Sequence, residues 1–310
     1  MTVDVSVIIT AYNVERYIAR AIRSALDQTG PAAEVIVIDD CSTDGTWAVI
    51  SGINDTRLKC LQLSKNGGPS IARNAGIAQA TGTWIAVLDG DDAFQPGRLE
   101  RCLNRAAGLK ADIVVDNLSV VHETGGAALP MFPPSRFSLA PTLDLAKFIA
   151  GNQSFMGGYT LGYLKPVFSA EFLRQHKLFY DPDIHIGEDY IIMAEALACG
   201  AVCAVEPSAG YLYTVRACSI SHRLAPDDIL RISACDKKFL ARHALDPAAR
   251  KAQRRREFSI RETYAFTLLV DAIKQKNIRE IFRTIAQCPT AIRYLWLPVK
   301  VRLVRWIGVA

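Results

Sequence analysis

The sequence of 310 residues contains no long apolar run and no paired-cysteine motif. No stretch approaches the roughly 20 consecutive apolar residues that a membrane-spanning helix requires, so we expect no transmembrane segment. The N-terminus has no basic segment followed by an apolar one, which argues against a secretory signal. None of the eight cysteines belongs to a Cys-x-x-Cys pair, and several lie in apolar, strand-like runs. This favours reduced thiols in a cytoplasmic protein over a disulfide framework or a zinc site.

Two common nucleotide-binding motifs are also missing. No Gly-x-Gly-x-x-Gly follows the first expected strand, which argues against a nicotinamide or flavin dehydrogenase. No Gly-x-x-x-x-Gly-Lys-Ser/Thr motif is present, which argues against P-loop kinases and ATPases. The length allows one large domain or two smaller ones.

Charge is distributed unevenly along the chain, whose net charge is +5. Residues 250–310 contain 14 lysines and arginines against 4 acidic residues, whereas the rest of the chain contains 22 against 27. A shift of this size marks a compositional boundary. It predicts that the C-terminal region meets an anionic surface.

The first 120 residues alternate short apolar runs with amphipathic stretches. The apolar runs are flanked by polar residues or glycine, as buried parallel strands are, and cover 5–9, 35–38, 58–63, 84–88 and 113–115. The stretches between them have helical spacing and cover 14–28, 43–50, 69–79 and 96–107. Alternating strands and helices predict an α/β fold around a mostly parallel sheet.

A segment with several glycines, prolines and serines, 122–142, interrupts this pattern, and we expect a surface loop there, over the site. Further ordered elements are expected at 160–164, 188–199, 202–205 and 211–215. From about residue 225 the pattern is helical, with helices expected at 227–243, 247–276 and 278–287. The sequence therefore predicts a C-terminal helical extension.

Polar residues follow three of the expected strands at their carboxyl ends, where open α/β sheets bind ligands. Carboxylates close to one another raise each other's pKa unless a positive charge lies among them. A hard divalent cation such as Mg2+ or Mn2+ takes oxygen ligands and bridges to phosphates. Each group alone could be an acidic turn or a helix cap, but three at one edge favour a binding site. The three groups are Thr10-Ala11-Tyr12-Asn13, Asp39-Asp40 and Asp89-Gly90-Asp91-Asp92.

These residue types suit a nucleotide with a diphosphate. The ring of Tyr12 could stack on a base, and the carboxylate of Asp39 could accept a hydrogen bond from the imide N–H of that base. The acidic cluster with its metal would hold a diphosphate and neutralise its charge as it departs. Arg73, within the segment 67–76, could add a cationic contact to the phosphates, although it could also be a surface helix charge.

Four segments, 6–13, 38–46, 68–76 and 88–92, together resemble a family 2 glycosyltransferase with the GT-A fold, in the family's order and spacing. The resemblance covers residues 3–105 and is to enzymes of bacterial exopolysaccharide and cell-surface glycan synthesis. It implies a nucleotide-diphosphate sugar donor, of UDP type, and a divalent metal, Mn2+ or Mg2+. Asp92 would be the principal metal ligand, with Asp91 near both the metal and the ribose. The implied nucleotide-binding residues are Thr10, Ala11, Tyr12, Asn13, Asp39, Asp40, Arg73 and Asp91.

The pair Glu188-Asp189 opens an expected helix, where two acids also suit the helix dipole. In the resembled family such a pair supplies the general base, which the resemblance assigns to Asp189 with Glu188 beside it. Asp189 would take the proton of the acceptor hydroxyl as its oxygen attacks the anomeric carbon, in a single displacement with inversion. The segment 213–222 resembles a family loop near the phosphates. Its candidate phosphate or acceptor contacts are Arg216, Ser219 and His222, although a plain hydrogen-bonded loop is an alternative for His222.

Processive members of the family carry a Gln-x-x-Arg-Trp motif and transmembrane helices. The nearest segment here, 302–306, lacks the glutamine, so the resemblance implies transfer of a single sugar. The expected organisation is a catalytic domain over 1–225, with a nucleotide-sugar half at about 1–120 and an acceptor half at about 121–225. A basic helical region follows over 226–310.

The basic C-terminal region intersperses its charges with Ile, Leu, Val and Trp, which favours a membrane surface over nucleic acid. Its first part could instead cap the catalytic domain. We therefore expect a cytoplasmic enzyme, peripheral at the inner face of the cell membrane, that adds one sugar to a lipid-linked glycan acceptor. Two alternatives stay open: a nucleotidyltransferase, which would not need Asp189 as a base, and a non-catalytic membrane scaffold that binds a nucleotide sugar.

Overall fold

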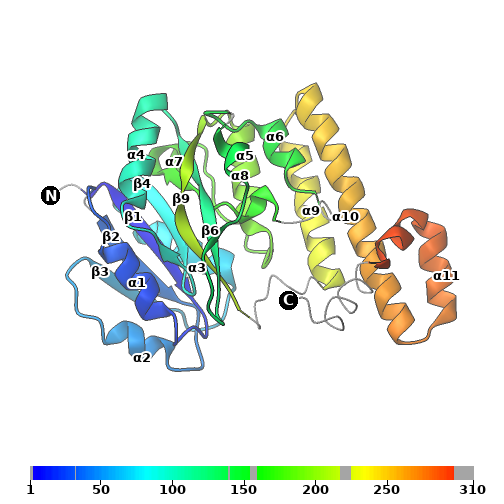
Figure 1. Cartoon of the computed structure of the whole chain (residues 1–310), viewed down its shortest axis with the longest axis horizontal. Helices are drawn as coiled ribbons and strands as arrows, with labels where there is room; N and C mark the ends of the chain where they lie inside the picture. The colour runs from blue at the N-terminus through cyan, green and yellow to red at the C-terminus, as the bar shows by residue number, and fades with distance from the viewer. Residues whose placement is uncertain (1–2, 32, 139, 154–158, 217–224, 297–310) are drawn as a thin grey trace.

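The computed structural model describes residues 3–31, 33–138, 140–153, 159–216 and 225–296. Within these residues a nine-stranded sheet runs in the order β3-β2-β1-β4-β8-β6-β9-β5, with β7 paired to β6. Figure 1 shows the C-terminal helices standing beside this sheet, with α11 farthest from it. The strands are β1 (Val5–Ala11), β2 (Ala33–Asp39), β3 (Leu58–Gln62), β4 (Trp84–Asp89), β5 (Ala93–Phe94), β6 (Ile113–His122), β7 (Leu129–Pro130), β8 (Val167–Ser169) and β9 (Cys203–Val215).

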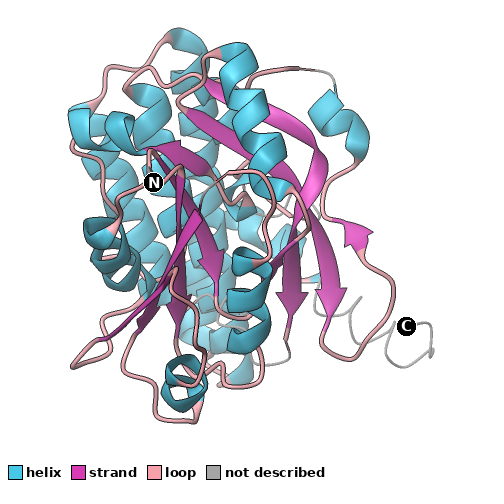
Figure 2. Cartoon of the chain, turned by 90° about the vertical axis from the view of Figure 1, so that its left-hand side faces the viewer, coloured by secondary structure: helices cyan, strands magenta, loops and turns pink. Residues whose placement is uncertain are grey.

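Helices connect most of these strands and form the C-terminal part of the described chain. Figure 2 shows helices packed around the strands of the sheet. Those of the sheet domain are α1 (Ile18–Leu26), α2 (Thr46–Ser51), α3 (Pro69–Gln79), α4 (Arg98–Leu109), α5 (Pro134–Ser138), α6 (Leu145–Ala150), α7 (Ala170–Gln175) and α8 (Glu188–Ala198), with the 3-10 turn η1 (Leu161–Tyr163). The C-terminal elements are α9 (Pro226–Arg242), α10 (Pro247–Lys274), α11 (Ile278–Gln287) and the 3-10 turn η3 (Pro289–Tyr294).

The longest strand pairings of the sheet are parallel. Strand β1 pairs in parallel with both β2 and β4, β2 with β3, and β6 with β9. Strand β8 pairs antiparallel with both β4 and β6 and so joins the two parallel parts. The expected α/β fold with a mostly parallel sheet is confirmed. Because the carboxyl ends of β1, β2 and β4 point the same way, the polar residues after them meet at one edge.

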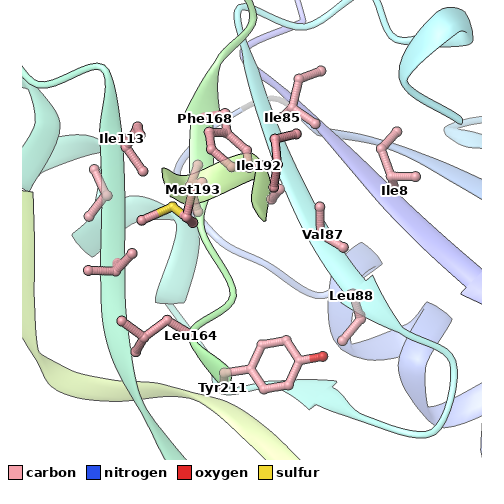
Figure 3. Close-up of a cluster of buried hydrophobic side chains, with 14 of the residues drawn as sticks. Ile8, Ile85, Val87, Leu88, Ile113, Leu164, Phe168, Ile192, Met193 and Tyr211 are labelled. Carbon is pink, nitrogen blue, oxygen red and sulfur yellow. The ribbon is translucent and has the colours of Figure 1, made fainter. Parts of the chain in front are cut away.

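The hydrophobic core connects the sheet to α8. Ile8, Val87 and Ile113, from β1, β4 and β6, belong to one buried cluster with Phe168 of β8 and Ile192 of α8 (Figure 3). Nearly every residue of α8 is buried, so this helix is anchored on more than one side. Its first turn, which carries the acidic pair, is therefore held rigidly beside the end of β4.

Two sequence predictions about local structure were wrong. The expected surface loop at 122–142 contains β7 and α5, and Met131, Phe132 and Phe137 within it are buried because they pack on the core. The two separate ordered elements expected at 202–205 and 211–215 are one strand, β9, whose pairing with β6 is irregular near Asn117. By contrast, the ordered element expected at 160–164 is present as the 3-10 turn η1.

The C-terminal helices pack in two separate hydrophobic clusters. Phe239 of α9 and Ala252 of α10 belong to the main core, so these helices pack directly on the sheet domain. Farther along, Ala265 of α10 is buried in a small separate cluster with Cys288 and Ala291, beyond α11. Across the described parts of the chain, no helix is both long enough and apolar enough to cross a membrane.

Candidate functional site

One pocket of about 800 Å³ collects most of the residues singled out in the sequence. It opens at the carboxyl ends of β1 and β4 and continues to the start of α8. Asp39 and Asn13 are not among the described residues that line it, and Ser219 and His222 lie outside the described residues. The expected site residues that line it are Thr10, Ala11, Tyr12, Asp40, Arg73, Asp91, Asp92, Glu188, Asp189 and Arg216.

The ends of β1 and β2 are linked by hydrogen bonds. The carboxylate of Asp39 is fully buried and accepts hydrogen bonds from Ser42 Oγ at 2.5 Å and Gln62 Nε2 at 2.9 Å. Asn13 has a positive φ of 52°, and its side-chain oxygen accepts a hydrogen bond from the Thr43 amide. These bonds fix the loops that follow the two strands. The predicted contacts of Asp39 and Asn13 with a nucleotide stay predictions.

Asp40 shapes the turn that leads into α3. Its two carboxylate oxygens accept hydrogen bonds from the amides of Gly67 and Gly68, each at 2.8 Å. Gly68 has a φ of 84°, a left-handed conformation that favours glycine. Burial raises the pKa of Asp40 in spite of these bonds. Beside this turn, the ring of Tyr12 is 43% exposed and faces the pocket, so it is available to a ligand.

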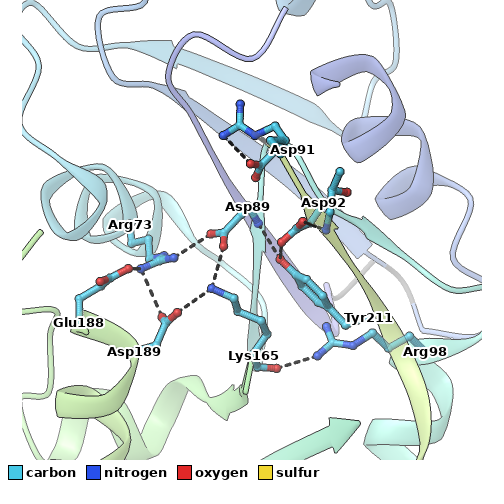
Figure 4. A network of polar contacts seen from close by, with 11 residues as sticks. Arg73, Asp89, Asp91, Asp92, Arg98, Lys165, Glu188, Asp189 and Tyr211 are labelled. Carbon is cyan, nitrogen blue, oxygen red and sulfur yellow. Dashed lines mark hydrogen bonds and ion pairs between the residues drawn. The ribbon is translucent and has the colours of Figure 1, made fainter. Parts of the chain in front are cut away.

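Two cations and three carboxylates form a buried network between β4 and α8 (Figure 4). Arg73 contacts Asp89 at 2.7 Å, Glu188 at 2.5 Å and Asp189 at 3.2 Å. Lys165 contacts Asp89 at 2.7 Å and Asp189 at 2.6 Å. The Arg73 side chain is only 2% exposed, and its charge is shared among carboxylates. Its predicted contact with phosphates stays a prediction.

The network leaves one oxygen of Asp189 without a hydrogen bond. Lys165 donates to Oδ2 of Asp189, whereas Oδ1 is buried without a hydrogen-bond partner, although the Arg73 guanidinium lies 3.2 Å away. Burial alone would lower the pKa of Lys165, but Asp189 and Asp89 raise it well above its usual value. Lys165 therefore stays protonated, and its ammonium group bridges the carboxylates of Asp189 and Asp89.

Asp92 has a different kind of environment. It is 1% exposed and accepts hydrogen bonds from the Tyr211 hydroxyl at 2.8 Å and the Thr214 amide at 2.7 Å (Figure 4). Burial, followed by the charges of Asp91 and Asp89, raises its pKa well above the usual value. The Tyr211 and Thr214 bonds orient a carboxylate whose negative charge they only partly balance.

Asp91, next to Asp92, contacts two arginines: Arg216 through its carboxylate and Arg20 through its backbone carbonyl. Its Oδ2 is 2.6 Å from the Arg216 guanidinium, yet burial raises its pKa. No group of three or more His, Cys, Asp or Glu side chains in the described residues is placed to hold a metal ion. Two carboxylates with raised pKa at one pocket nonetheless suit a hard cation that takes its remaining ligands from phosphates and water.

The far wall of the pocket comes from the C-terminal helices. Ile229 and Ile232 of α9 and Ile260 of α10 are apolar residues that line the pocket, and Ile232 lies beside Gly187 at the start of α8. Arg256 of α10 also lines the pocket, but it is paired with Asp236 at 2.9 Å and buried. These helices therefore complete the site as well as covering the core.

Sequence reasoning missed three contributions to this site. The first is Lys165, whose only signal was a single charge in an otherwise apolar stretch, 161–168. The second is Tyr211, an alternating strand residue with no distinguishing pattern. The third is the isoleucine wall, whose helical spacing indicated burial but not what the helices would face.

Comparison with known proteins shows similarity along almost the whole chain. The chain is 46% identical over 302 residues to the succinoglycan biosynthesis protein ExoO of Rhizobium meliloti (strain 1021), covering 97% of this chain and 86% of that protein. It is 37% identical to ExoU of the same organism, over 93% of this chain and 84% of ExoU. A shorter match, 44% identical over 88 residues, covers 28% of this chain and 35% of the Escherichia coli UDP-Glc:alpha-D-GlcNAc-diphosphoundecaprenol beta-1,3-glucosyltransferase WfaP.

Solved structures share the fold. The crystal structure of S. aureus TarS 1-349 in complex with UDP-GlcNAc gives a TM-score of 0.65 at 21% identity, covering 92% of this chain and 80% of that one. The mannosyltransferase PcManGT from Pyrobaculum calidifontis, in complex with GDP-Man and Mn2+, gives 0.61 at 18% identity, covering 96% and 82%. The model of glycosyl transferase family 2 matches residues 6–170. With ExoO and ExoU also matched over more than four fifths of their lengths, this chain belongs to glycosyl transferase family 2 and has its GT-A-like fold.

Proposed function

We propose that this protein is an inverting glycosyltransferase that moves one sugar from a UDP-sugar to a lipid-linked glycan during exopolysaccharide synthesis. The observation that carries the proposal is one pocket lined by both strand-end acids and an acidic helix start. The strand ends offer groups for a nucleotide diphosphate, and Asp189 offers a base within the same cavity. Transfer with inversion requires both within one cavity, with the base and the diphosphate on opposite faces of the anomeric carbon.

On the donor side, Tyr12 and Thr10 would contact the nucleoside and Asp91 the ribose. Arg216 is the cation best suited to the diphosphate, because its partner Asp91 lies in the pocket and its side chain is partly exposed. A phosphate can replace that carboxylate as the partner of a guanidinium at little cost in geometry. The UDP-GlcNAc bound in TarS and the GDP-Man bound in PcManGT support a nucleotide-sugar donor.

A divalent cation would be held by Asp92 and Asp91. Burial raises the pKa of both carboxyl groups, and two carboxylates at one pocket supply the oxygen ligands that Mn2+ or Mg2+ prefers. When bound, such an ion would neutralise the charge that develops on the departing diphosphate. The Tyr211 and Thr214 hydrogen bonds would keep Asp92 oriented toward it.

Asp189 would act as the general base. Its Oδ1, which has no hydrogen bond, would take the proton of the acceptor hydroxyl. As that proton leaves, the hydroxyl oxygen forms a bond to the anomeric carbon on the face opposite the diphosphate. The bond from that carbon to the diphosphate oxygen breaks, and the nucleoside diphosphate departs with the electron pair, which inverts the configuration. Lys165 and Arg73 act as positioning residues, and Glu188 anchors Arg73.

The acceptor and the location of the enzyme are inferred from three features. ExoO and ExoU are named for succinoglycan biosynthesis, and WfaP for a sugar acceptor on a diphosphate lipid. The apolar wall of α9 and α10 suits the less polar part of such an acceptor. The basic C-terminal region suits the cytoplasmic face of an anionic membrane, where that acceptor would be presented.

The test is turnover of a panel of UDP-, GDP- and dTDP-sugars, with and without Mn2+, by the wild type and by Asp189→Asn. We expect one UDP-sugar to be turned over and the variant to lose about 10² to 10⁴ in kcat, because a positioned base contributes that much. Asp183→Asn is the control, since its carboxylate is 69% exposed and paired with Lys238.

Two outcomes would contradict the proposal. Full activity of Asp189→Asn with a nucleoside triphosphate substrate would favour a nucleotidyltransferase. Absence of turnover or hydrolysis with every nucleotide sugar, together with measurable binding of one, would favour a non-catalytic scaffold.

A further inference from the structure

Helix α11 carries an apolar face that the described chain does not cover. Ile278 and Phe282 are 67% and 68% exposed and lie four residues apart, so they share one side of the helix. Ile273 at the end of α10 and Ile292 in η3 are also exposed. We call Ile278 and Phe282 the α11 face; Ile273 and Ile292 lie on the two elements that contact this helix.

The other side of α11 already has a packing partner. Thr284 is buried, Ile281 and Ile285 are half-buried, and Cys288 just after the helix belongs to the small cluster with α10. The outward isoleucine and phenylalanine are therefore not needed to attach the helix. Figure 1 shows α11 beside the lower half of α10, on the side away from the sheet. Large exposed apolar groups at such a site mark an interaction surface.

Basic residues surround this face. Residues 273–296 contain five lysines and arginines and one acidic residue, Glu280, which contacts Arg283 at 3.3 Å. The cations Lys274, Lys276 and Arg279 are exposed beside the apolar residues. An apolar stripe with cations on its flanks is complementary to an anionic lipid surface, where the apolar groups enter the acyl boundary and the cations meet headgroups.

We propose that the α11 face docks on an anionic bilayer and holds the enzyme there. The docking itself does not depend on the proposed function; only its purpose, to bring the pocket to a lipid-linked acceptor, rests on that function. The chain that follows the face supports a bilayer as the partner. Residues 297–310 contain three basic and no acidic residues among apolar ones. The composition that suits an anionic membrane therefore continues in the sequence after the face.

The basic run at 250–256 is a weaker candidate for this contact. Ala252 and Gln253 within it are buried, and Arg256 is paired with Asp236 inside the protein. Four of its cations, Arg250, Lys251, Arg254 and Arg255, are exposed, but no large apolar residue accompanies them in that run. Charge without an apolar anchor gives binding that salt screens readily.

The face is tested by sedimentation of the full chain with phosphatidylcholine vesicles, with and without phosphatidylglycerol. The wild type should bind only the anionic vesicles. The double variant Ile278→Ser with Phe282→Ser should bind them about tenfold less or weaker, because two large apolar anchors are lost. Phe179→Ser is the matched control, since Phe179 is 62% exposed but lies outside the face, and it should bind as the wild type does.

Activity and assembly measurements separate the possible failures. Both variants should keep wild-type donor hydrolysis and thermal midpoint, since the α11 face is not among the described residues that line the pocket. Unchanged vesicle binding by the double variant would overturn the proposal, as would binding that does not depend on phosphatidylglycerol. A wild-type dimer that the double variant converts to a monomer, without vesicle binding by either, would show that a second copy covers the face. Absence of donor turnover by the wild type would instead contradict the proposed function.

Discussion

Two carboxylates at the end of the same strand, Asp89 and Asp92, have opposite electrostatic surroundings. Asp89 contacts both Arg73 and Lys165, and although burial alone would raise the pKa of Asp89, Lys165 and Arg73 lower it. Asp92 receives neutral hydrogen-bond donors in the described chain, and burial together with neighbouring carboxylates raises its pKa. The charge of Asp89 is thus balanced by two cations, whereas that of Asp92, three positions later, is not.

The difference indicates separate tasks for the two ends of the cluster. A buried carboxylate that is paired with fixed cations contributes to structure and cannot readily accept a further ion. A buried carboxylate without a cation is costly to keep charged, and that cost falls when a metal binds. Asp89 therefore belongs to the scaffold that holds Asp189, and Asp92 to the proposed metal site. Substitutions at the two positions should separate stability from activity.

Between these two positions, the largest effect on activity is expected from Asp92→Asn. Its activity should fall about 10² to 10³-fold, because the proposed metal loses its principal ligand. Its free energy of unfolding should stay within about 1 kcal/mol of the wild type, because a lost hydrogen bond is offset by removal of an unbalanced buried charge. Turnover assays and thermal unfolding of the same preparation measure both.

Asp89→Asn is the matched comparison for this variant. It should lose about 3 to 5 kcal/mol of stability as well as activity, because it leaves Arg73 and Lys165 short of a carboxylate. Equal loss of stability in the two variants would remove the distinction drawn between Asp89 and Asp92.

The next effect is that of Lys165→Met. It removes the cation that joins Asp89 to Asp189, leaving two buried carboxylates with less compensation. We expect a loss of about 3 to 5 kcal/mol, with a fall in kcat, and partial rescue of both by Lys165→Arg. Denaturant unfolding and turnover are the measurements.

Lys238→Met provides the control for a lysine with two carboxylate partners. Lys238 contacts Asp181 and Asp183 but is 45% exposed, so its loss should cost no more than about 1 kcal/mol. If the two lysine variants are equally stable, the buried network does not hold the site together.

The sequence was most informative where chemistry is local in the chain. Thr10, Tyr12, Asp91 and Asp92 follow strands that the apolar pattern identifies, and parallel pairing brings strand ends to one edge whatever the loops do. Their assembly in one pocket therefore follows from short-range signals. The start of α8, with Asp189, also had a local helix pattern.

Contacts that depend on distant packing could not be predicted in the same way. Lys165 reaches its carboxylates because β8 is inserted antiparallel between β4 and β6, and no pattern in the sequence fixes that order. The buried side of α10 contains Arg256 and Thr263, so its sequence pattern mixes polar and apolar residues. The sequence alone does not distinguish an arginine with a buried ion-pair partner from one on the surface. Tertiary partners, not propensity, decide the burial of such groups.

A smaller effect is expected from Mn2+ on stability, and it should depend on pH. Because the pKa of Asp92 is raised in the folded state, the native protein binds more protons than the unfolded chain above the ordinary value of 3.8. Stability from this group is therefore lost as pH rises through the raised pKa, and a bound metal restores it.

At a metal concentration about 100 times its dissociation constant, stabilisation should approach 2 to 3 kcal/mol. It should be larger at about pH 8 than at about pH 5, where protons compete for the carboxylate. Thermal shifts measure this, and Asp92→Asn should show none; an equal shift in that variant would place the metal elsewhere.

The smallest effect is expected from Arg216→Gln, which tests the boundary between the two surroundings. Arg216 contacts Asp91 at 2.6 Å but is partly exposed, so its loss should change the free energy of unfolding by less than about 1 kcal/mol. If it moves to the donor diphosphate, KM for the donor should rise about tenfold with a smaller change in kcat, because the contact is made in both ground and transition states. Arg216→Lys should recover part of that loss, since it keeps the charge without the two-pronged geometry. A variant with unchanged KM but tighter Mn2+ binding would mean that Arg216 serves only to compensate Asp91 in the absence of metal, which would assign the diphosphate contact to another cation.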